Sequence, residues 1–216
     1  MSQNKKISKE VNSSRDPKNT KLKILNAARR EFADKGLNGA RVDAIALRSG
    51  VNKQLLYYYF GDKEKLYTAV LEAAYIKLRE KEKRLHLEKL DPMQAMEVLV
   101  GFTFDYLAEN RQFVALLNDE NIHRARHIKK SKVVRGLHSK LQVMLSQILQ
   151  RGAQEGVFRR DVDPVEFFIS MTALGYFYFS NGHTLSHIFG RNFTGRAERE
   201  ARREHVLEFV SAYLRN

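Results

Sequence analysis

The stretch VNKQLLYYYF, residues 51–60, places the polar side chains of Lys53 and Gln54 shortly before four consecutive aromatic residues. A helix turns about 100° per residue, so the four aromatic side chains point in different directions and cannot share one core. Lys53 can donate to guanine and Gln54 can pair with adenine, which suits the tip of a helix in the major groove. Tyr57 shares a face with Lys53 and can offer its hydroxyl to a phosphate, with Tyr58 the second candidate. The alternative is a fully buried aromatic cluster.

Two histidine pairs have a spacing that can bind zinc. His183 and His187 are four residues apart, as are His123 and His127, so each pair would share a helix face. No third ligand lies near His183 and His187 in sequence, and we interpret His123 and His127 in the same way. We therefore expect no metal and no cofactor, and we expect these histidines to be structural or exposed.

Composition limits the chemistry further. The 216-residue chain has no cysteine, which excludes disulfides, thiolate nucleophiles and cysteine-ligated metals. We find no nucleophile–base arrangement, paired catalytic carboxylates or phosphate loop, so we do not expect an enzyme. The start of the chain has no apolar signal-peptide core, and no apolar run approaches about 18 residues. These features predict a soluble, cytoplasmic protein.

The charge points to a polyanionic partner. The chain carries 38 Lys and Arg against 25 Asp and Glu, a formal charge of +13. Residues 1–66 hold 15 basic and 7 acidic residues, so the positive excess is denser in the first third. We expect any contact with nucleic-acid phosphates there.

The elements around the aromatic stretch predict a helix-turn-helix. Apolar spacing indicates a helix from Thr20 to a C-cap at Gly36, and a short second helix from Val42 to Leu47. Gly50 supplies the sharp turn, and Asn52 can cap a third helix through Tyr59. Residues 1–18 are predicted to be a disordered basic tail, 19–66 the DNA-binding domain, and 67–216 a helical effector-binding and dimerisation domain.

The rest of the chain also reads as helical, which makes the fold class all-α with about nine helices. Asp62 is expected to cap a long fourth helix through about Leu87. Asp91–Pro92 and Asp163–Pro164 combine an N-cap with proline at the first helical position, which predicts helices over 92–109 and 164–187. Further helices are expected over 111–120, 131–155 and 198–215.

Several differently spaced elements resemble one known family. They are IL-x-AA-x-x-x-F at 24–32, Gly36, V-x-x-IA at 42–46, and GV-x(4)-LYYYF-x-x-KEKL at 50–66. Together they resemble the DNA-binding domain of the TetR (tetracycline repressor) family of transcription regulators. The resemblance covers about the first 50 residues after the tail. It implies a homodimer that binds a double-stranded, pseudo-palindromic operator and is released by a small-molecule effector.

The resemblance also implies a set of DNA contacts. In this sequence they are Thr20 and Lys21, then Lys53, Gln54 and Tyr57, and finally Lys63. One position departs from the family, because Arg41 stands where the second helix usually begins with Ser or Thr. The hydroxyl cap is lost, so Asn38 or the backbone must substitute, while Arg41 gains a potential phosphate contact. Our full set of expected DNA contacts is Thr20, Lys21, Arg41, Asn52, Lys53, Gln54, Tyr57, Tyr58 and Lys63.

An effector pocket is expected among the aromatic residues of the C-terminal domain. The residues proposed for it are Phe102, Tyr106, Phe113, Leu117, Asn118, His123, Phe168 and Tyr176. The polar stretch NDENIHRARHIKK, 118–130, could instead converge on an anionic effector, although a solvated connection between helices is the more ordinary interpretation.

The last two long helices are expected to form the dimer interface, as the resemblance also implies. Residues 166–180 are apolar around most of a helix, which is too much for one solvent face. Gly175 would let a partner backbone approach closely. The expected interface residues are Phe167, Met171, Leu174, Gly175, Tyr178, Val206, Phe209, Val210 and Tyr213. The alternative is that this helix is central to its own monomer, and both interpretations can hold for different faces of the helix.

With an enzyme not expected, two function classes remain open. The first is a ligand-responsive transcriptional repressor. The second is a constitutive DNA-architectural protein without an effector response, which would carry a basic surface throughout. The concentration of charge in the first third favours the repressor.

Overall fold

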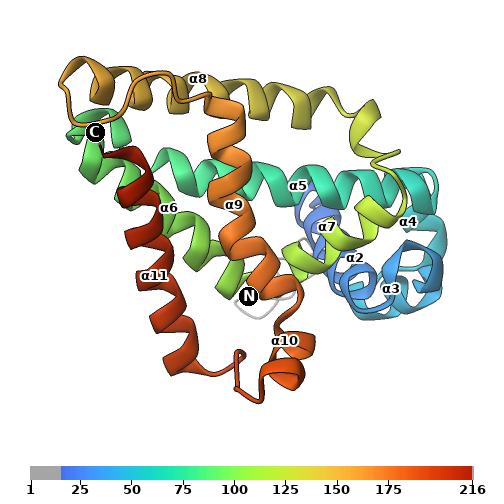
Figure 1. Ribbon diagram of the computed structural model, residues 1–216. Helices are drawn as coiled ribbons and strands as arrows, with labels where there is room; N and C mark the ends of the chain where they lie inside the picture. The colour runs from blue at the N-terminus through green and yellow to red at the C-terminus, as the bar shows by residue number, and fades with distance from the viewer. Residues whose placement is uncertain (1–15, 216) are drawn as a thin grey trace, which may run out of the picture. The chain divides into compact units, whose positions relative to one another are not determined.

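The computed structural model describes residues 16–215, which contain ten α-helices and no strand (Figure 1). The chain divides into two compact units. Unit 1 comprises the chain up to Ala73 together with Asp119–Lys130, and unit 2 comprises Ala74–Asn118 and Ser131–Asn216. The helices are α2 (Pro17–Gly39), α3 (Val42–Ser49), α4 (Lys53–Phe60), α5 (Lys63–Lys83), α6 (Pro92–Glu109), α7 (Arg111–Ile122), α8 (Lys132–Gln154), α9 (Pro164–Ser180), α10 (Gly182–Phe189) and α11 (Arg196–Leu214). Short 3-10 turns follow α5 and α7.

The first helix begins earlier and continues further than predicted. Asp16 caps it by accepting from the Lys18 amide at 2.9 Å, and Pro17 occupies the first turn. Gly36 adopts a φ of 65° inside α2, so it kinks the helix where the sequence predicted a terminus. The first 15 residues of the predicted basic tail lie outside the described residues, and residues 16–18 belong to the helix and its cap.

The turn between α3 and α4 has the predicted geometry. Gly50 adopts the left-handed conformation at φ 70°, and Asn52 caps α4 by accepting from the Leu55 amide at 2.7 Å. Ile45 and Leu56 are fully buried between the helices. These local bonds fix the angle at which α4 leaves the turn, so its remaining faces are displayed to solvent.

Residues 119–130 pack with the N-terminal helices, although they follow them by about fifty positions in sequence. The predicted domain boundary at 66/67 assigned this segment to the C-terminal domain. The Leu37 amide donates to Oδ2 of Asp119 at 2.9 Å. A Cβ on Gly36 would lie 2.6 Å from the same carboxylate, so glycine leaves room for this close approach.

Unit 2 is a helical bundle with α6 at its centre. Helix α6 packs against α8, α9 and α11, and its buried face includes Leu99, Val100 and Phe104. Asp91 caps α6 and Asp163 caps α9, each before proline, as the sequence predicted. Ser131 caps α8, which ends two residues before Gly156.

Two predicted helix ends in unit 2 were wrong. The helix expected over 164–187 breaks at Asn181, where α9 stops and the separate helix α10 begins. Helix α5 ends at Lys83 rather than near Leu87, because the chain turns there into a short 3-10 segment that begins after His86 at φ 50°. Among the described residues, no helix is long and apolar enough to cross a bilayer.

Candidate nucleic-acid interface and ligand cavity

The aromatic residues of α4 divide between core and solvent. Leu56, just before them, is fully buried, and Tyr59 and Phe60 are half-buried. Tyr58 is 81% exposed and Tyr57 is 39% exposed. A fully buried aromatic cluster is therefore ruled out, and two tyrosines face solvent on the same short helix as the exposed Lys53 and Gln54.

Lys53 is held by a neighbouring carboxylate. Its Nζ atom lies 3.0 Å from Oδ1 of Asp43 on α3, and both side chains are exposed. The hydrogen bond that Lys53 donates to Asp43 raises the pKa of Lys53 above its ordinary value, so the ammonium stays charged. A solvent-exposed pair of this kind is weak and exchanges readily for another anion. Lys53 is therefore positioned, but it remains available to a phosphate or a base edge.

The other predicted contact residues surround α4 within unit 1. Lys21 lies 5.5 Å from the ring centroid of Tyr59, and Nζ of Lys63 donates to the carbonyl oxygen of Asn38 at 3.3 Å. The Thr20 hydroxyl donates to the Asp16 carbonyl at 3.0 Å, so it closes the first turn of α2. The Asn52 side-chain oxygen is occupied by the α4 cap, which leaves its amide NH₂ to donate.

Arg41 precedes α3 as an exposed residue, and the helix has no side-chain cap. Asn38 does not substitute for the missing hydroxyl. Instead the Arg41 amide donates at 3.3 Å to Oε1 of Glu31, a carboxylate that is only 7% exposed. Arg48 also lies 3.8 Å from Glu31. The start of α3 is thus tied to α2 through this buried carboxylate, and the Arg41 guanidinium is left at the surface.

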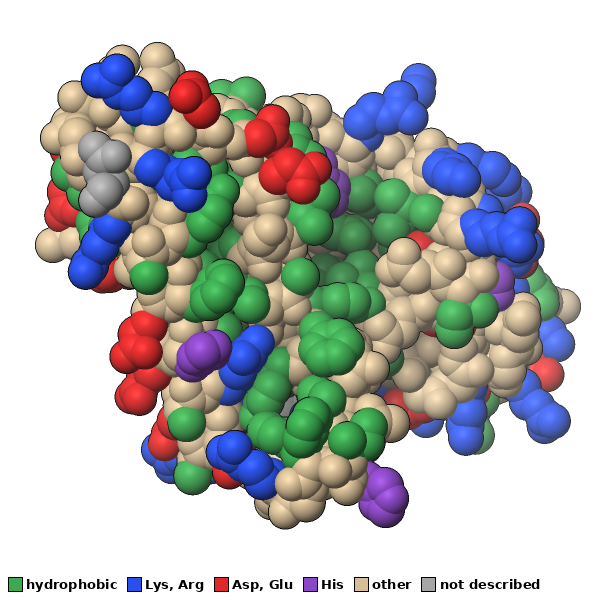
Figure 2. All heavy atoms as spheres, viewed as in Figure 1, with side chains coloured by type: hydrophobic (Ala, Val, Ile, Leu, Met, Phe, Trp, Pro, Cys, Tyr) green, Lys and Arg blue, Asp and Glu red, His purple; other side chains and the backbone are tan. Residues whose placement is uncertain are grey.

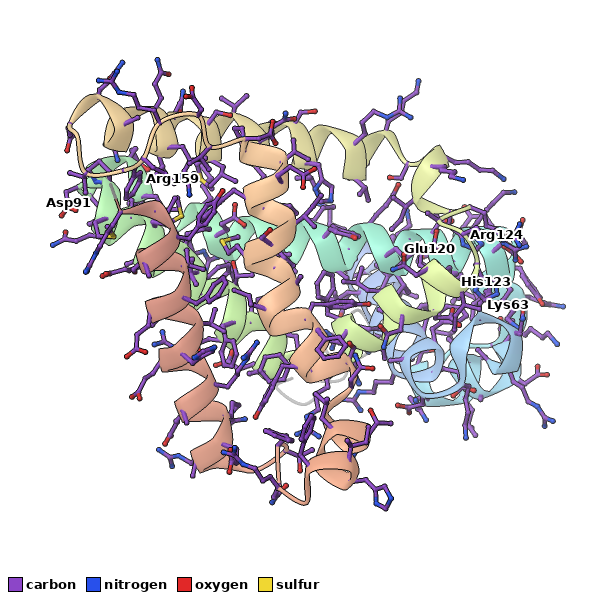
Figure 3. All side chains as sticks on the ribbon, viewed as in Figure 1. Lys63, Asp91, Glu120, His123, Arg124 and Arg159 are labelled. Carbon is purple, nitrogen blue, oxygen red and sulfur yellow. The ribbon has the colours of Figure 1, made fainter. Side chains whose placement is uncertain are left out.

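The segment 119–130 is more than a solvated connection, because two of its polar side chains are buried while others are exposed. Glu120 is 1% exposed and His127 is 5% exposed. Nδ1 of His127 lies 2.6 Å from Glu120, and its Nε2 lies 2.5 Å from Glu64 at the start of α5. The Tyr67 ring meets the imidazole edge-on at 4.8 Å. Figure 3 shows Glu120, His123, Arg124 and Lys63 gathered in this part of unit 1.

Unit 2 contains a cavity of about 160 Å³ that is lined mainly by aromatic and aliphatic side chains. Five of the predicted pocket residues line it: Tyr106, Phe113, Leu117, Phe168 and Tyr176. Asn118 accepts a hydrogen bond from the Tyr176 hydroxyl and lines a second, more polar cavity of about 200 Å³ with the exposed Arg111 and His183. The apolar, more enclosed cavity is the better candidate for a small organic ligand.

Two of the predicted pocket residues lie elsewhere. Phe102 packs against the Tyr106 ring at 5.9 Å between centroids but is not part of the cavity wall. His123 belongs to unit 1, where its Nδ1 atom lies 2.8 Å from the Asp119 carbonyl oxygen. The prediction failed for His123 because α7 carries the chain out of unit 2 after Asn118.

The cavity also contains a buried ion pair that was not predicted. Arg79 and Glu82, one turn apart on α5, bond to each other with side chains only 12% and 6% exposed. Burial raises the pKa of Glu82 and lowers that of Arg79, while their mutual attraction opposes both shifts. His138 lies nearby, and burial together with the Arg79 charge lowers its pKa, which favours the neutral imidazole. The spacing of Tyr75, Arg79 and Glu82 on one helix face was visible in the sequence.

Comparison with known proteins decides the family. The model of bacterial regulatory proteins of the tetR family matches residues 24–70. The model of the tetracyclin repressor-like C-terminal domain matches residues 92–210, which is more than half of the chain. The chain belongs to the TetR family.

Relatives agree with this assignment. The HTH-type transcriptional repressor NicS of Pseudomonas putida is 38% identical over 167 residues, which are 77% of this chain and 79% of NicS. The repressor SCO4008 of Streptomyces coelicolor is 52% identical over 58 residues, 27% and 30% of the two chains. The structure of the regulator SCO4942 of Streptomyces coelicolor matches at a TM-score of 0.69 and 23% identity, covering 90% and 98%. This TetR protein is a DNA-binding transcriptional repressor.

The predicted dimer residues of this TetR protein are mostly part of its own core. The buried ones are Phe167, Met171, Gly175, Tyr178, Val206 and Val210, and Leu174 packs against the same core. A Cβ on Gly175 would lie 3.3 Å from Leu107 and 3.4 Å from Phe104, so the close approach is to α6 of the same chain. The prediction was wrong for these residues because α9 is central to its own monomer. Phe209 and Tyr213 are exposed, as an interface requires.

A different stripe of α9 is exposed. Val165, Ile169 and Phe177 are 45%, 54% and 58% exposed, and they recur at helical spacing on the side away from α6. Figure 2 shows hydrophobic side chains at the surface over α9 and α10. The apolar circumference noted in the sequence was real, but the buried and exposed stripes could not be distinguished without knowing where α6 lies.

Among residues 16–215, no cluster of three or more potential metal ligands occurs. His183 and His187 are exposed, and His127 is committed to two carboxylates.

Proposed function

We propose that unit 1 binds an inverted-repeat operator through the N-terminal part of α4, and that a small molecule in the apolar cavity of unit 2 releases the repressor. The observation that carries the DNA-binding half is the division of α4 between a buried Leu56 and the exposed Lys53, Gln54, Tyr57 and Tyr58. In this proposal Lys53 and Gln54 read base edges, and the tyrosines contact the backbone.

The flanking residues would position the helix on the duplex. Lys21, Arg41 and Lys63 supply cations around α4, and Thr20 closes the turn from which Lys21 projects. Contacts of this kind with phosphates fix orientation and register without reading sequence. They also make binding depend on salt, because each neutralised phosphate releases counterions.

The repressor would act as a homodimer in the cytoplasm, where its operator is found. The exposed stripe Val165, Ile169 and Phe177 on α9, with Phe209 and Tyr213 on α11, supplies an apolar surface on the two helices expected to meet a second copy. Such a surface is unfavourable in water unless covered. A two-fold dimer also presents two α4 helices to two half-sites, which matches an inverted repeat.

Selection of bound duplexes from a random pool, at fixed and moderate salt, tests the DNA-binding proposal. Enrichment of one inverted repeat is expected. If no sequence is enriched, and if binding disappears as the salt concentration rises, a constitutive architectural protein would be favoured instead. The Gln54→Ala variant provides an internal comparison, because it should enrich a related repeat with relaxed preference at one position per half-site.

A further inference from the structure

The size of the apolar cavity limits what the repressor can sense. Its volume is about 160 Å³. An apolar protein cavity of about 150 Å³ holds a single benzene ring. A fused four-ring steroid or a long acyl chain is several times larger than one ring and would not fit without rebuilding the bundle. The cavity therefore matches a one-ring molecule.

The walls of the cavity favour a flat, aromatic ring. The ring centroid of Phe113 lies 5.5 Å from that of Tyr75, with an angle of 83° between the ring planes. It lies 5.6 Å from the centroid of Tyr106, with an angle of 81°. Tyr75 in turn meets His138 at 5.4 Å. Edge-to-face packing of this kind gains from a further ring placed among the first, because ring edges and faces carry opposite partial charges. An aliphatic ligand would lack this attraction between ring edges and ring faces.

Two polar groups in the cavity wall have no partner. The Nε–H of Arg79 and the Oγ1 of Thr172 are buried without a hydrogen-bond partner among the described residues. Both belong to residues that line the cavity. Both can donate, and a buried donor without an acceptor is unfavourable. A ligand that carries a hydrogen-bond acceptor would satisfy them.

Three other polar groups of the cavity wall have partners within the chain. Glu82 neutralises Arg79, Thr103 donates to the Leu99 carbonyl at 2.8 Å, and the Tyr176 hydroxyl bonds to Asn118. The buried polar atoms of the cavity wall that lack a partner among the described residues are Nε of Arg79 and Oγ1 of Thr172. This asymmetry gives a ligand one preferred orientation, with its acceptor toward α5 and α9.

We propose that the effector is a single planar aromatic ring bearing a carbonyl or carboxylate acceptor, bound with that acceptor toward Arg79 and Thr172. The proposal rests on the assignment of this cavity as the effector site and adds the chemical class of ligand. A neutral acceptor leaves the Arg79–Glu82 pair intact. A carboxylate on the ligand would share Arg79 with the carboxylate of Glu82. Of these two residues, Glu82 is the one that can take up a proton, because burial raises its pKa.

The test is calorimetric titration of the full-length repressor with four probes: benzamide, benzoate, toluene and a four-ring steroid. Binding of benzamide or benzoate, with weaker binding of toluene and none of the steroid, is expected. Comparison of benzamide with benzoate shows whether the acceptor is neutral or charged. Toluene binding as tight as both acceptor-bearing rings, binding of the steroid, or no binding of any ring would overturn the proposal.

A matched pair of variants locates the acceptor. Thr172→Val removes the unpartnered hydroxyl, and Thr103→Val removes a hydroxyl of the same cavity that is already bonded within its helix. Thr172→Val should weaken the acceptor-bearing ring about tenfold, in line with loss of one hydrogen bond, and leave toluene unchanged. Thr103→Val should leave both unchanged. Equal losses in both variants, or a loss for toluene, would contradict the assigned orientation, and toluene also reports whether each variant keeps its cavity.

Release of the selected operator separates this proposal from the proposed function. A ring probe that binds in the calorimeter but does not release the DNA would contradict the effector role of the cavity. A larger ligand that releases the DNA, and whose effect is abolished by filling the cavity with Leu117→Phe, would retain the effector role and overturn the one-ring proposal. Leu117 lines the cavity on α7.

Discussion

Nδ1 of His127 lies 2.6 Å from Oε2 of Glu120, and both side chains are almost completely buried. Glu120 also accepts from the backbone amides of His127 and Ile128, at 2.8 and 3.0 Å. One buried carboxylate therefore holds both the side chain and the backbone of the segment that closes unit 1. On its other side, the imidazole reaches Glu64, next to the proposed phosphate-binding residue Lys63.

Replacement of His127 by alanine should loosen this segment. Glu120 would keep its two amide donors but lose its imidazole partner, at a cost of about 2 kcal/mol in unfolding free energy. Hydrogen exchange of the His127 and Ile128 region measures the effect, with the exposed His183→Ala as control. Unchanged exchange in His127→Ala would show that the backbone bonds alone hold the segment.

The Glu64–His127 contact predicts a pH dependence. The hydrogen bond from His127 lowers the pKa of Glu64 below its ordinary 4.5. A carboxyl group whose pKa is depressed on folding stabilises the protein above its unfolded pKa, and the stabilisation disappears as the pH falls through the folded value. Glu64→Gln should therefore reduce stability at pH 7, by less than about 1 kcal/mol because the side chain is half exposed. Denaturant unfolding from pH 7 down to pH 3 should show wild type and variant converging; a difference that grows toward low pH would reverse the assignment.

The Asp43–Lys53 pair predicts a gain of DNA affinity. Asp43→Asn removes a negative charge beside the duplex and frees the Lys53 ammonium, so binding to the selected operator should tighten by a few-fold at low salt. Lys53→Ala should weaken binding and reduce the salt slope by about one counterion if Lys53 contacts a phosphate. Fluorescence anisotropy across a salt series measures both. Weaker binding by Asp43→Asn would mean that the pair orients Lys53 productively rather than competing for it.

Substitutions of Tyr57 and Gln54 on α4 should affect DNA binding in different ways. Tyr57→Phe should weaken binding to all duplexes alike, because a phosphate contact carries no sequence information, whereas Gln54→Ala should lose about 1–3 kcal/mol of discrimination at one base pair. Affinities for a panel of single-base operator variants separate the two effects. A loss confined to one sequence in Tyr57→Phe would exclude a phosphate role, and an unchanged profile in Gln54→Ala would remove it from base reading.

Two residues of α9 should respond oppositely to substitution. Ile169 is 54% exposed, so Ile169→Asp should dissociate the dimer with little effect on monomer stability. Phe167 is 4% exposed, so Phe167→Ala should destabilise the monomer by about 3–5 kcal/mol. Sedimentation velocity and thermal unfolding measure the two outcomes. A dimer unaffected by Ile169→Asp would place the interface on another surface.

Local sequence signals determined where several helices of both units begin. Asn52, Gly50 and the Asp–Pro starts of α6 and α9 act through hydrogen bonds to amides two or three residues away, or through the φ of one residue. They need no distant partner, so these elements formed where the sequence predicted them. The exposed Lys53, Gln54 and Tyr57 followed from the same local geometry once either Leu55 or Leu56 was placed in the core, and the structure shows that Leu56 is the buried one.

Only the tertiary structure decided which apolar stripe of α9 is buried, where residues 119–130 belong, and which polar groups line the cavity. Phe167 and Ile169 are equally apolar in sequence, and their different burial depends on α6, which is more than sixty residues away. His127 bonds to Glu64, which is 63 residues away in sequence. Thr172 on α9 and Arg79 on α5 line the same cavity. Pairings of this kind depend on how whole helices pack, and packing is a property of shape and volume that residue spacing along one helix does not contain.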